Sequence, residues 1–293
     1  TLRHTLFPYT TLFRSLPNPV MPASGTYECD DANSMLFSPS ELGAIVNKTV
    51  FLHARTGNPP PRLQETPCGM LNAIGIPTEG IDVFIKETLP KMASYGIPII
   101  VSVAGSSVEE YCTIARIIAD SGKADLIEWN LSCPNLQEGI EWSRDDKQLY
   151  RVVNAVAETC PLPVIAKLSP AVTDIAEMAG IAEEAGASAL ALINTYKGIK
   201  IDINKKKPVL GNVTGGLSGP AIRPLAVYAV WSVYERTSLP IIGMGGVCSW
   251  EDAVELMLAG ATAVGVGMYN FVNPMIMKEI IAGLSSYAAE QGI

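Results

Sequence analysis

Histidine is almost missing from this chain of 293 residues, which contains only His4 and His53. His4 lies in an atypical leader, and His53 precedes Arg55 in a predicted surface loop, so general-base catalysis by histidine is disfavoured. Six cysteines are present, but no two form a C-x-x-C pair and no histidine cluster accompanies them. The sequence therefore argues against a zinc site or an iron–sulfur cluster on this chain, and we expect no resident metal.

Long apolar runs and basic clusters are scarce as well. No apolar stretch reaches the ~20 residues that a membrane-spanning helix needs. Lys and Arg number 21 against 29 Asp and Glu, which gives a formal net charge of −8. This balance disfavours nucleic acid or an anionic membrane surface as a partner. Cysteines without a pairing pattern are typical of a reducing compartment, so we expect a cytoplasmic protein.

The first fifteen residues differ in character from the rest. They are rich in Thr, Leu and Phe, and they lack the long apolar core and the small-residue cleavage site of a signal peptide. We interpret residues 1–15 as an atypical leader, with an artefactual origin as one explanation. Residues 16–293 are expected to form a single domain.

Eight short apolar runs recur along the chain with helical patterns between them. Near-continuous hydrophobicity is typical of parallel strands that are buried on both faces. Helices are predicted over residues 107–119, 173–185 and 249–258. Eight β/α units in this length predict a (β/α)₈ TIM barrel, and the alternative is a doubly wound open sheet, which lacks its usual G-x-G-x-x-G opening. The predicted strands cover residues 18–21, 44–48, 97–103, 125–130, 163–168, 189–194, 240–244 and 263–267.

Two long connections, 49–97 and 195–239, follow the second and sixth predicted strands and are expected to build a site at the C-terminal face of the barrel. Lys48 and Lys167 stand at this face in otherwise apolar strands. A buried ammonium group is costly unless it faces an anion or a polar ligand. The alternative is a structural ion pair with a barrel carboxylate such as Glu128.

Glycines after the last two predicted strands indicate a phosphate site. Gly245 and Gly246 follow the seventh strand, and Gly267 ends the eighth. In barrels these two loops and a helix N-terminus bind phosphate through backbone N–H groups. Ordinary turn glycines are the alternative. Met70 and Met92 are given no functional role.

One cysteine stands between two asparagines directly after the fourth predicted strand, in the sequence NLSCPN over residues 130–135. Amides can orient a polar ring by donating and accepting hydrogen bonds, and a thiolate can take a proton from it. Cys133 is therefore a candidate general base. The alternative is a small buried hydrophobic residue, the usual role of a single cysteine.

Eight segments between residue 18 and about residue 273 together form a specific pattern. They are NPVMPASGT (18–26), GNPPPR (57–62), ETPCGMLNAIG (65–75), NLSCPN (130–135), KLSPAVTD (167–174), VLGNVTGGLSGP (209–220), IIGMGG (241–246) and NFVNP (270–274). In this pattern the chain resembles the catalytic subunit of the class 1 dihydroorotate dehydrogenases, and in particular the NAD-linked class 1B branch. The resemblance implies a (β/α)₈ barrel that binds FMN and oxidises (S)-dihydroorotate to orotate in de novo pyrimidine (UMP) biosynthesis.

The resemblance also implies residue roles. Cys133 would remove a proton from C5 of dihydroorotate while hydride passes from C6 to FMN N5. The substrate would be bound by Lys48, Asn72, Ala73, Ile74, Gly75, Ile76, Asn130, Asn194 and Thr195. FMN would be bound by Ser24, Lys48, Thr49, Ser102, Asn130, Lys167, Ile193, Gly219, Gly245, Gly246, Gly267 and Met268.

The chain departs from the family pattern at a few positions. Ser102 stands where the family usually has Asn, Met268 stands where it usually has Thr, and residues 27–35 differ from the usual Phe/Gly-rich segment. These departures concern FMN binding more than the reaction.

The implied partners are a second copy in a homodimer and an electron-transfer subunit with FAD and a [2Fe–2S] cluster, together a heterotetramer that reduces NAD⁺. Three alternatives stay open. They are a class 1A-type enzyme that uses fumarate, a dihydropyrimidine dehydrogenase-like enzyme, and a non-catalytic barrel that binds a phosphate ligand.

Overall fold

The computed structural model describes residues 16–28, 31–131 and 142–292. In this part of the chain, eight parallel strands form one sheet in the order β1-β14-β13-β8-β7-β6-β5-β2. Each strand overlaps one of the eight predicted runs, so the strand predictions are confirmed. Their bounds are β1 Val20–Pro22, β2 Ile45–Val46, β5 Ile99–Val103, β6 Leu126–Asn130, β7 Val164–Lys167, β8 Ala189–Leu192, β13 Ile241–Met244 and β14 Ala263–Val266.

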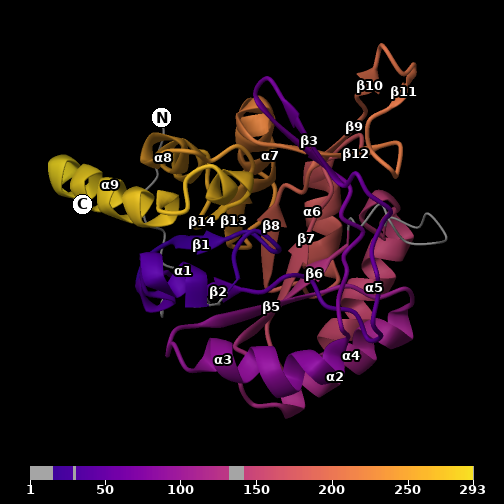
Figure 1. The fold of residues 1–293 in the computed structure, drawn as a ribbon. Helices are drawn as coiled ribbons and strands as arrows, with labels where there is room; N and C mark the ends of the chain where they lie inside the picture. Colours follow the sequence, from indigo (N-terminus) through magenta and orange to yellow (C-terminus); the bar gives the residue numbers. More distant parts are fainter. Residues whose placement is uncertain (1–15, 29–30, 132–141, 293) are drawn as a thin grey trace.

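The sheet closes where its two edge strands, β1 and β2, approach each other. The N–H of Gly43, just before β2, donates to the carbonyl of Val20 in β1 at 2.8 Å. A Cβ at Gly43 would lie only 3.0 Å from that carbonyl oxygen, so glycine permits this approach. The predicted (β/α)₈ barrel is thereby confirmed (Figure 1), and the open doubly wound sheet is excluded.

Helices alternate with the strands and surround the barrel (Figure 1). The three predicted helices are α4, α6 and α8, which begin after the caps Ser107, Asp174 and Ser249; each cap side chain accepts a backbone N–H of the first turn. No helix in the described ranges is long and apolar enough to cross a membrane. The helices are α1 Asp31–Leu36, α2 Ile81–Val83, α3 Leu89–Ala93, α4 Val108–Asp120, α5 Asp146–Thr159, α6 Ile175–Glu184, α7 Arg223–Tyr234, α8 Trp250–Leu258 and α9 Ile276–Gln291.

The barrel interior changes from apolar to polar along the strands. Side chains two residues apart in a strand point to the same face. Ser102, Glu128 and Lys167 follow two residues after apolar interior positions and are themselves buried. Polar groups therefore collect toward the C-terminal ends of the strands, above a dry apolar layer of Met21, Val46, Ile100, Leu126, Ile165 and Ile242.

A second, antiparallel sheet is built from the two long connections. Its four strands lie in the order β3-β4-β12-β9, so β4 from the first connection pairs with β12 from the second. A short hairpin of β10 and β11 projects beyond this sheet (Figure 1). The bounds are β3 Leu63–Thr66, β4 Gly69–Asn72, β9 Tyr196–Gly198, β10 Ile201–Asp202, β11 Lys207–Pro208 and β12 Gly215–Ser218.

Candidate active site

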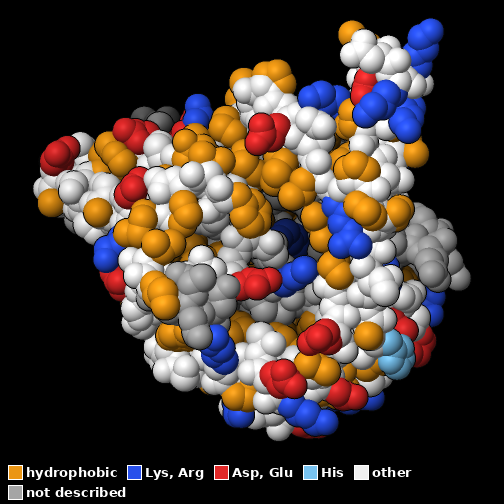
Figure 2. Space-filling view, viewed as in Figure 1, with side chains coloured by type: hydrophobic (Ala, Val, Ile, Leu, Met, Phe, Trp, Pro, Cys, Tyr) orange, Lys and Arg blue, Asp and Glu red, His pale blue; other side chains and the backbone are white. Residues whose placement is uncertain are grey.

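A cavity of about 570 Å³ lies between the C-terminal ends of the barrel strands and the four-stranded sheet. Figure 2 shows its mouth as a hollow with hydrophobic side chains around much of it. Its volume is in the range of small-ligand and cofactor sites. Its position is the one at which (β/α)₈ barrels carry their active sites.

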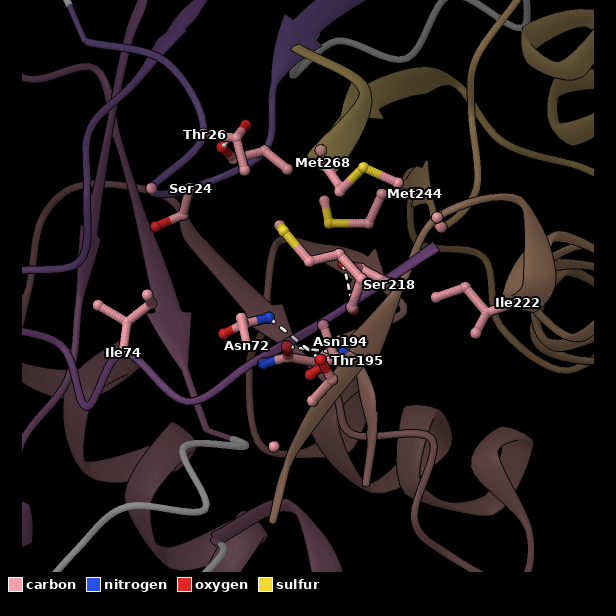
Figure 3. A pocket seen from close by; sticks show the side chains of 18 of the residues that line it. Ser24, Thr26, Asn72, Ile74, Asn194, Thr195, Ser218, Ile222, Met244 and Met268 are labelled. Atoms are coloured by element: carbon pink, nitrogen blue, oxygen red, sulfur yellow. Dashed lines mark hydrogen bonds between the residues drawn. The ribbon is translucent and has the colours of Figure 1, made fainter. Parts of the chain in front are cut away.

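The structure brings together almost all of the residues singled out from the sequence. In Figure 3 the side chains of Asn72, Asn194 and Thr195 point toward the space that Ser24 and Met268 also border. The predicted residues that line the cavity are Ser24, Lys48, Thr49, Asn72, Ala73, Ile74, Gly75, Ile76, Asn130, Lys167, Ile193, Asn194, Thr195, Gly219, Gly245, Gly246, Gly267 and Met268.

Two predicted residues stand apart from this set. Ser102 is fully buried and is not among the described residues that line the cavity. Cys133, the candidate base, lies outside the described residues, as does its neighbour Asn135. Asn130, three positions before Cys133, ends β6 in the cavity wall.

Lys167 occupies the floor of the cavity. Its Nζ lies 3.5 Å from Oε1 of Glu128, and both residues are buried. The same carboxylate oxygen accepts a hydrogen bond from Ser102 Oγ at 2.9 Å. The alternative considered for a barrel lysine was an ion pair with Glu128, and this ion pair is present. Lys167 also lines the cavity, so it has both the ion pair and a place in the cavity wall.

Ser102 belongs to a chain of hydroxyl groups beneath the cavity. Its Oγ lies 3.0 Å from Thr49 Oγ1, which in turn lies 3.0 Å from Ser24 Oγ. Ser24 and Thr49 line the cavity, whereas Ser102 does not. The polar chain therefore connects Glu128 in the interior with hydroxyl groups at the surface of the cavity.

Lys48 differs from Lys167 in its surroundings. It is partly exposed, and no carboxylate of the described residues lies within ion-pair distance of it. The neighbouring Asn47 holds the backbone here, since its Nδ2 donates to the Lys48 carbonyl at 2.7 Å. A cation that lines a cavity without a carboxylate partner suits an anionic group of a ligand.

Amide side chains at the ends of β6 and β8 orient one another. Asn194 Nδ2 donates to Asn130 Oδ1 at 3.3 Å, and Asn194 Oδ1 accepts the N–H of Thr195 at 2.8 Å. Asn130 Nδ2 lies 3.4 Å from Thr49 Oγ1. Amides fixed in this way present both donors and acceptors to a bound ring.

The four-stranded sheet supplies another amide from the opposite side. Asn72, at the end of β4, donates through Nδ2 to the Gly216 carbonyl of β12 at 3.2 Å. The chain that follows it is held by Asn58, whose Nδ2 donates to the Ala73 carbonyl at 3.1 Å and whose N–H donates to the Ile74 carbonyl at 3.0 Å. The segment 72–76 is therefore a supported part of the wall.

Glycine backbones form another part of the wall, as predicted for the ends of the last two strands. Gly245 and Gly246 have φ of 129° and 78°, a region that side chains disfavour. Gly219, with φ of 100°, approaches so closely that a Cβ would lie 2.7 Å from Gly69 Cα. Gly267 joins them after β14.

Some cavity residues were not singled out from the sequence. Met70, for which no functional role was expected, lines the cavity, whereas Met92 is a core residue. Met70 is brought in by the pairing of β4 with β12, which joins chain segments about 150 residues apart, as in Ser218 with Met70. Met70, Met244 and Phe271 all lie inside segments that resemble the family and could have been suspected from them.

Comparison with known proteins identifies the family. The family model for dihydroorotate dehydrogenase matches residues 9–287. Dihydroorotate dehydrogenase B (NAD(+)), catalytic subunit, of Desulforudis audaxviator is 47% identical over 280 residues, covering 95% of this chain and 91% of that protein. The proteins of the same name from Desulforamulus reducens and Bacteroides thetaiotaomicron are 47% and 42% identical, covering 94% of this chain and 91% and 92% of theirs. The chain therefore belongs to the dihydroorotate dehydrogenase family.

Proposed function

We propose that this chain oxidises (S)-dihydroorotate to orotate, a step of de novo UMP synthesis, with FMN as its redox cofactor. The observation that carries the proposal is the convergence of Asn72, Asn130 and Asn194 with Lys48 and Lys167 in one cavity. Dihydroorotate has ring carbonyl and N–H groups for the amides and a carboxylate for a lysine. The printed name of the relatives, which specifies the same substrate, supports the proposal.

The residues of the cavity fit FMN. The volume of about 570 Å³ accommodates a ligand of that class beside a small substrate. Lys167 and the hydroxyl groups of Ser24 and Thr49 would hold the ring system, with Asn130, Lys48 and Ile193 around it. Ser102 would act from beneath, through Thr49. Backbone N–H groups of the glycine loops would hold the phosphate; these loops contain Gly219, Gly245, Gly246, Gly267 and Met268.

The chain's own groups bind and orient the substrate. Lys48 pairs with the carboxylate, and the amides of Asn72, Asn130 and Asn194 hold the ring together with Thr195. Ala73, Ile74, Gly75 and Ile76 form the adjoining wall. The four-stranded sheet contributes Asn72, at the end of β4, and Gly216, in β12, to the same wall.

Proton removal is assigned to Cys133. Its thiolate takes the proton from C5 of dihydroorotate, a role that rests on the sequence because Cys133 lies outside the described residues. Lys167 keeps a positive charge at the cavity floor, where it stabilises negative charge that develops in the reaction. Bound FMN supplies the acceptor for the hydride that leaves C6.

We further infer that electrons pass to NAD⁺ through a second subunit with FAD and a [2Fe–2S] cluster, in a heterotetramer built on a homodimer of this chain. The words "catalytic subunit" and "NAD(+)" in the names of the relatives support this inference. We place the enzyme in the cytoplasm, because Cys68, Cys112, Cys160 and Cys248 are free thiols and such thiols suit a reducing compartment.

The purified chain tests the proposal in two steps. Its visible spectrum should show a flavin band, either as isolated or after addition of FMN; a chain that binds no flavin would instead be a phosphate-ligand-binding barrel. Dihydroorotate should then bleach the band. Turnover with fumarate alone would move the chain to the class 1A type, and bleaching by a dihydropyrimidine but not by dihydroorotate would favour a dihydropyrimidine dehydrogenase-like enzyme.

A further inference from the structure

Two glycine loops of the cavity wall are joined by an ion pair that lies outside the cavity. Gly219 comes shortly before Arg223, the first residue of α7, and Gly246 comes shortly before Asp252, in the first turn of α8. Arg223 Nη1 donates to Asp252 Oδ1. Neither side chain is among the described residues that line the cavity. The pair therefore acts on the loops and not on a ligand.

Asp252 also holds the chain that follows the glycines. Its Oδ2 accepts the backbone N–H of Cys248 at 2.9 Å and lies 3.0 Å from Cys248 Sγ. Burial, followed by the Asp252 carboxylate, raises the pKa of the Cys248 thiol to about 11, so at neutral pH the thiol is a donor. In return, the N–H of Asp252 donates to Ser249 Oγ at 3.3 Å. One buried carboxylate thus fixes the 245–249 loop and Arg223 together.

The backbones of the two loops are in direct contact. A Cβ at Gly246 would lie 2.7 Å from Arg223 Cβ and 2.9 Å from both Arg223 N and Gly219 O. Gly246 also has a φ of 78°, which is strained for any side chain. The orientation of the backbone N–H groups of residues 245–247 therefore depends on the position of Arg223.

The pair also affects the charge near the glycine loops. Helix N-termini usually attract anions. Asp252, however, places a negative charge in the first turn of α8, near the loop that is proposed to bind the phosphate. Arg223 compensates this charge, and its Nε also lies 3.2 Å from the exposed Glu255 Oε2.

We propose that Arg223 and Asp252 are positioning residues that hold the 219–223 and 245–249 loops in the arrangement that binds the phosphate of FMN. This proposal rests on the proposed function, because it requires FMN as the ligand. The pair would act only on the loops that hold the phosphate of FMN. Loss of the pair should therefore weaken the binding of FMN but not that of riboflavin, which has the same ring without the phosphate.

The test is a titration of the flavin-free protein with FMN and, separately, with riboflavin, followed by flavin fluorescence. Arg223→Gln and Asp252→Asn should each weaken FMN binding by about tenfold or more and should leave riboflavin affinity unchanged. Arg223→Gln leaves the buried Asp252 carboxylate without its cation, and Asp252→Asn removes the carboxylate that holds both Arg223 and the Cys248 N–H. Glu251→Gln is the matched control, since it removes a charge from the same turn of α8 without touching the pair. It should not weaken FMN binding and should leave riboflavin affinity unchanged.

Equal weakening of both flavins, or an unchanged FMN affinity, would overturn the proposal. If Arg223→Gln does not fold, Arg223→Lys serves instead: it keeps the charge but not the planar guanidinium fork, and it should lower the ratio of FMN to riboflavin affinity several-fold. An unchanged ratio there would also overturn the proposal. A wild-type chain that binds neither flavin would instead contradict the proposed function, so the two failures are distinguishable.

Discussion

Lys167 Nζ and Glu128 Oε1 lie 3.5 Å apart in the barrel interior, joined across the neighbouring strands β7 and β6. Both side chains are almost fully buried. A buried ion pair adds little net stability, but removal of one partner leaves an uncompensated charge. Glu128 therefore allows a lysine to stand at the floor of the cavity, and Ser102 holds the carboxylate through a 2.9 Å hydrogen bond.

Glu128→Gln should lower the free energy of unfolding of the flavin-free protein by about 3 kcal/mol, because the Lys167 ammonium stays buried without its counter-charge. Urea unfolding followed by circular dichroism measures this. The double variant Glu128→Gln/Lys167→Met removes both charges and should recover most of the loss. A double variant no more stable than the single one would show that the two charges are not coupled.

Asn72→Ala should raise the KM for dihydroorotate by about tenfold with flavin content unchanged, because Asn72 reaches the cavity from the four-stranded sheet and is assigned to the substrate and not to FMN. Steady-state kinetics and the flavin absorbance give the two quantities. Gln64→Ala is the control: Gln64 lies on the neighbouring strand β3 and is not among the described cavity residues. A loss of flavin in Asn72→Ala would contradict the assignment.

Much of the barrel can be read from the sequence because parallel strands buried on both faces are short apolar runs. Lys48 and Lys167 interrupt such runs, and that anomaly correctly marked the cavity. The sequence could not tell the two apart. Lys167 has a buried carboxylate beside it and Lys48 has none among the described residues, and this depends on which side chains meet across the closed barrel.

The four-stranded sheet could not be predicted from the sequence. Its strands β3, β4, β9 and β12 are three or four residues long, and their pairing joins two distant connections. Short strands rich in glycine carry little periodic signal, so neither their existence nor their register is marked. The Arg223–Asp252 pair was missed because it matters only through a contact between residues distant in sequence.

Cys248 should resist alkylation. Its pKa of about 11 leaves on the order of one thiolate in a thousand at pH 8, whereas Cys68 is exposed to the reagent. Iodoacetamide at pH 8 followed by peptide mass mapping should label Cys68 at least about tenfold faster. Because the folded state raises this pKa from 9.0, the thiol's contribution to stability is present below pH 9 and is lost as the pH rises toward 11. Equal labelling of the two cysteines would contradict the shift.

Cys133→Ala should keep bound FMN but lose turnover with dihydroorotate by a factor of about 10² to 10⁴, the usual contribution of a general base. Visible absorbance measures flavin content, and stopped-flow bleaching measures the chemical step. A free thiol titrates near pH ~8.5, so the wild-type rate should rise with pH through that region and the variant should lose this dependence. Cys68→Ala, at an exposed cysteine, is the control and should match the wild type. If Cys133→Ala bleached as fast as wild type, another group would have to take the C5 proton, and with so few histidines in the chain the search would turn to Lys48 and to water held by the Asn130–Asn194 pair.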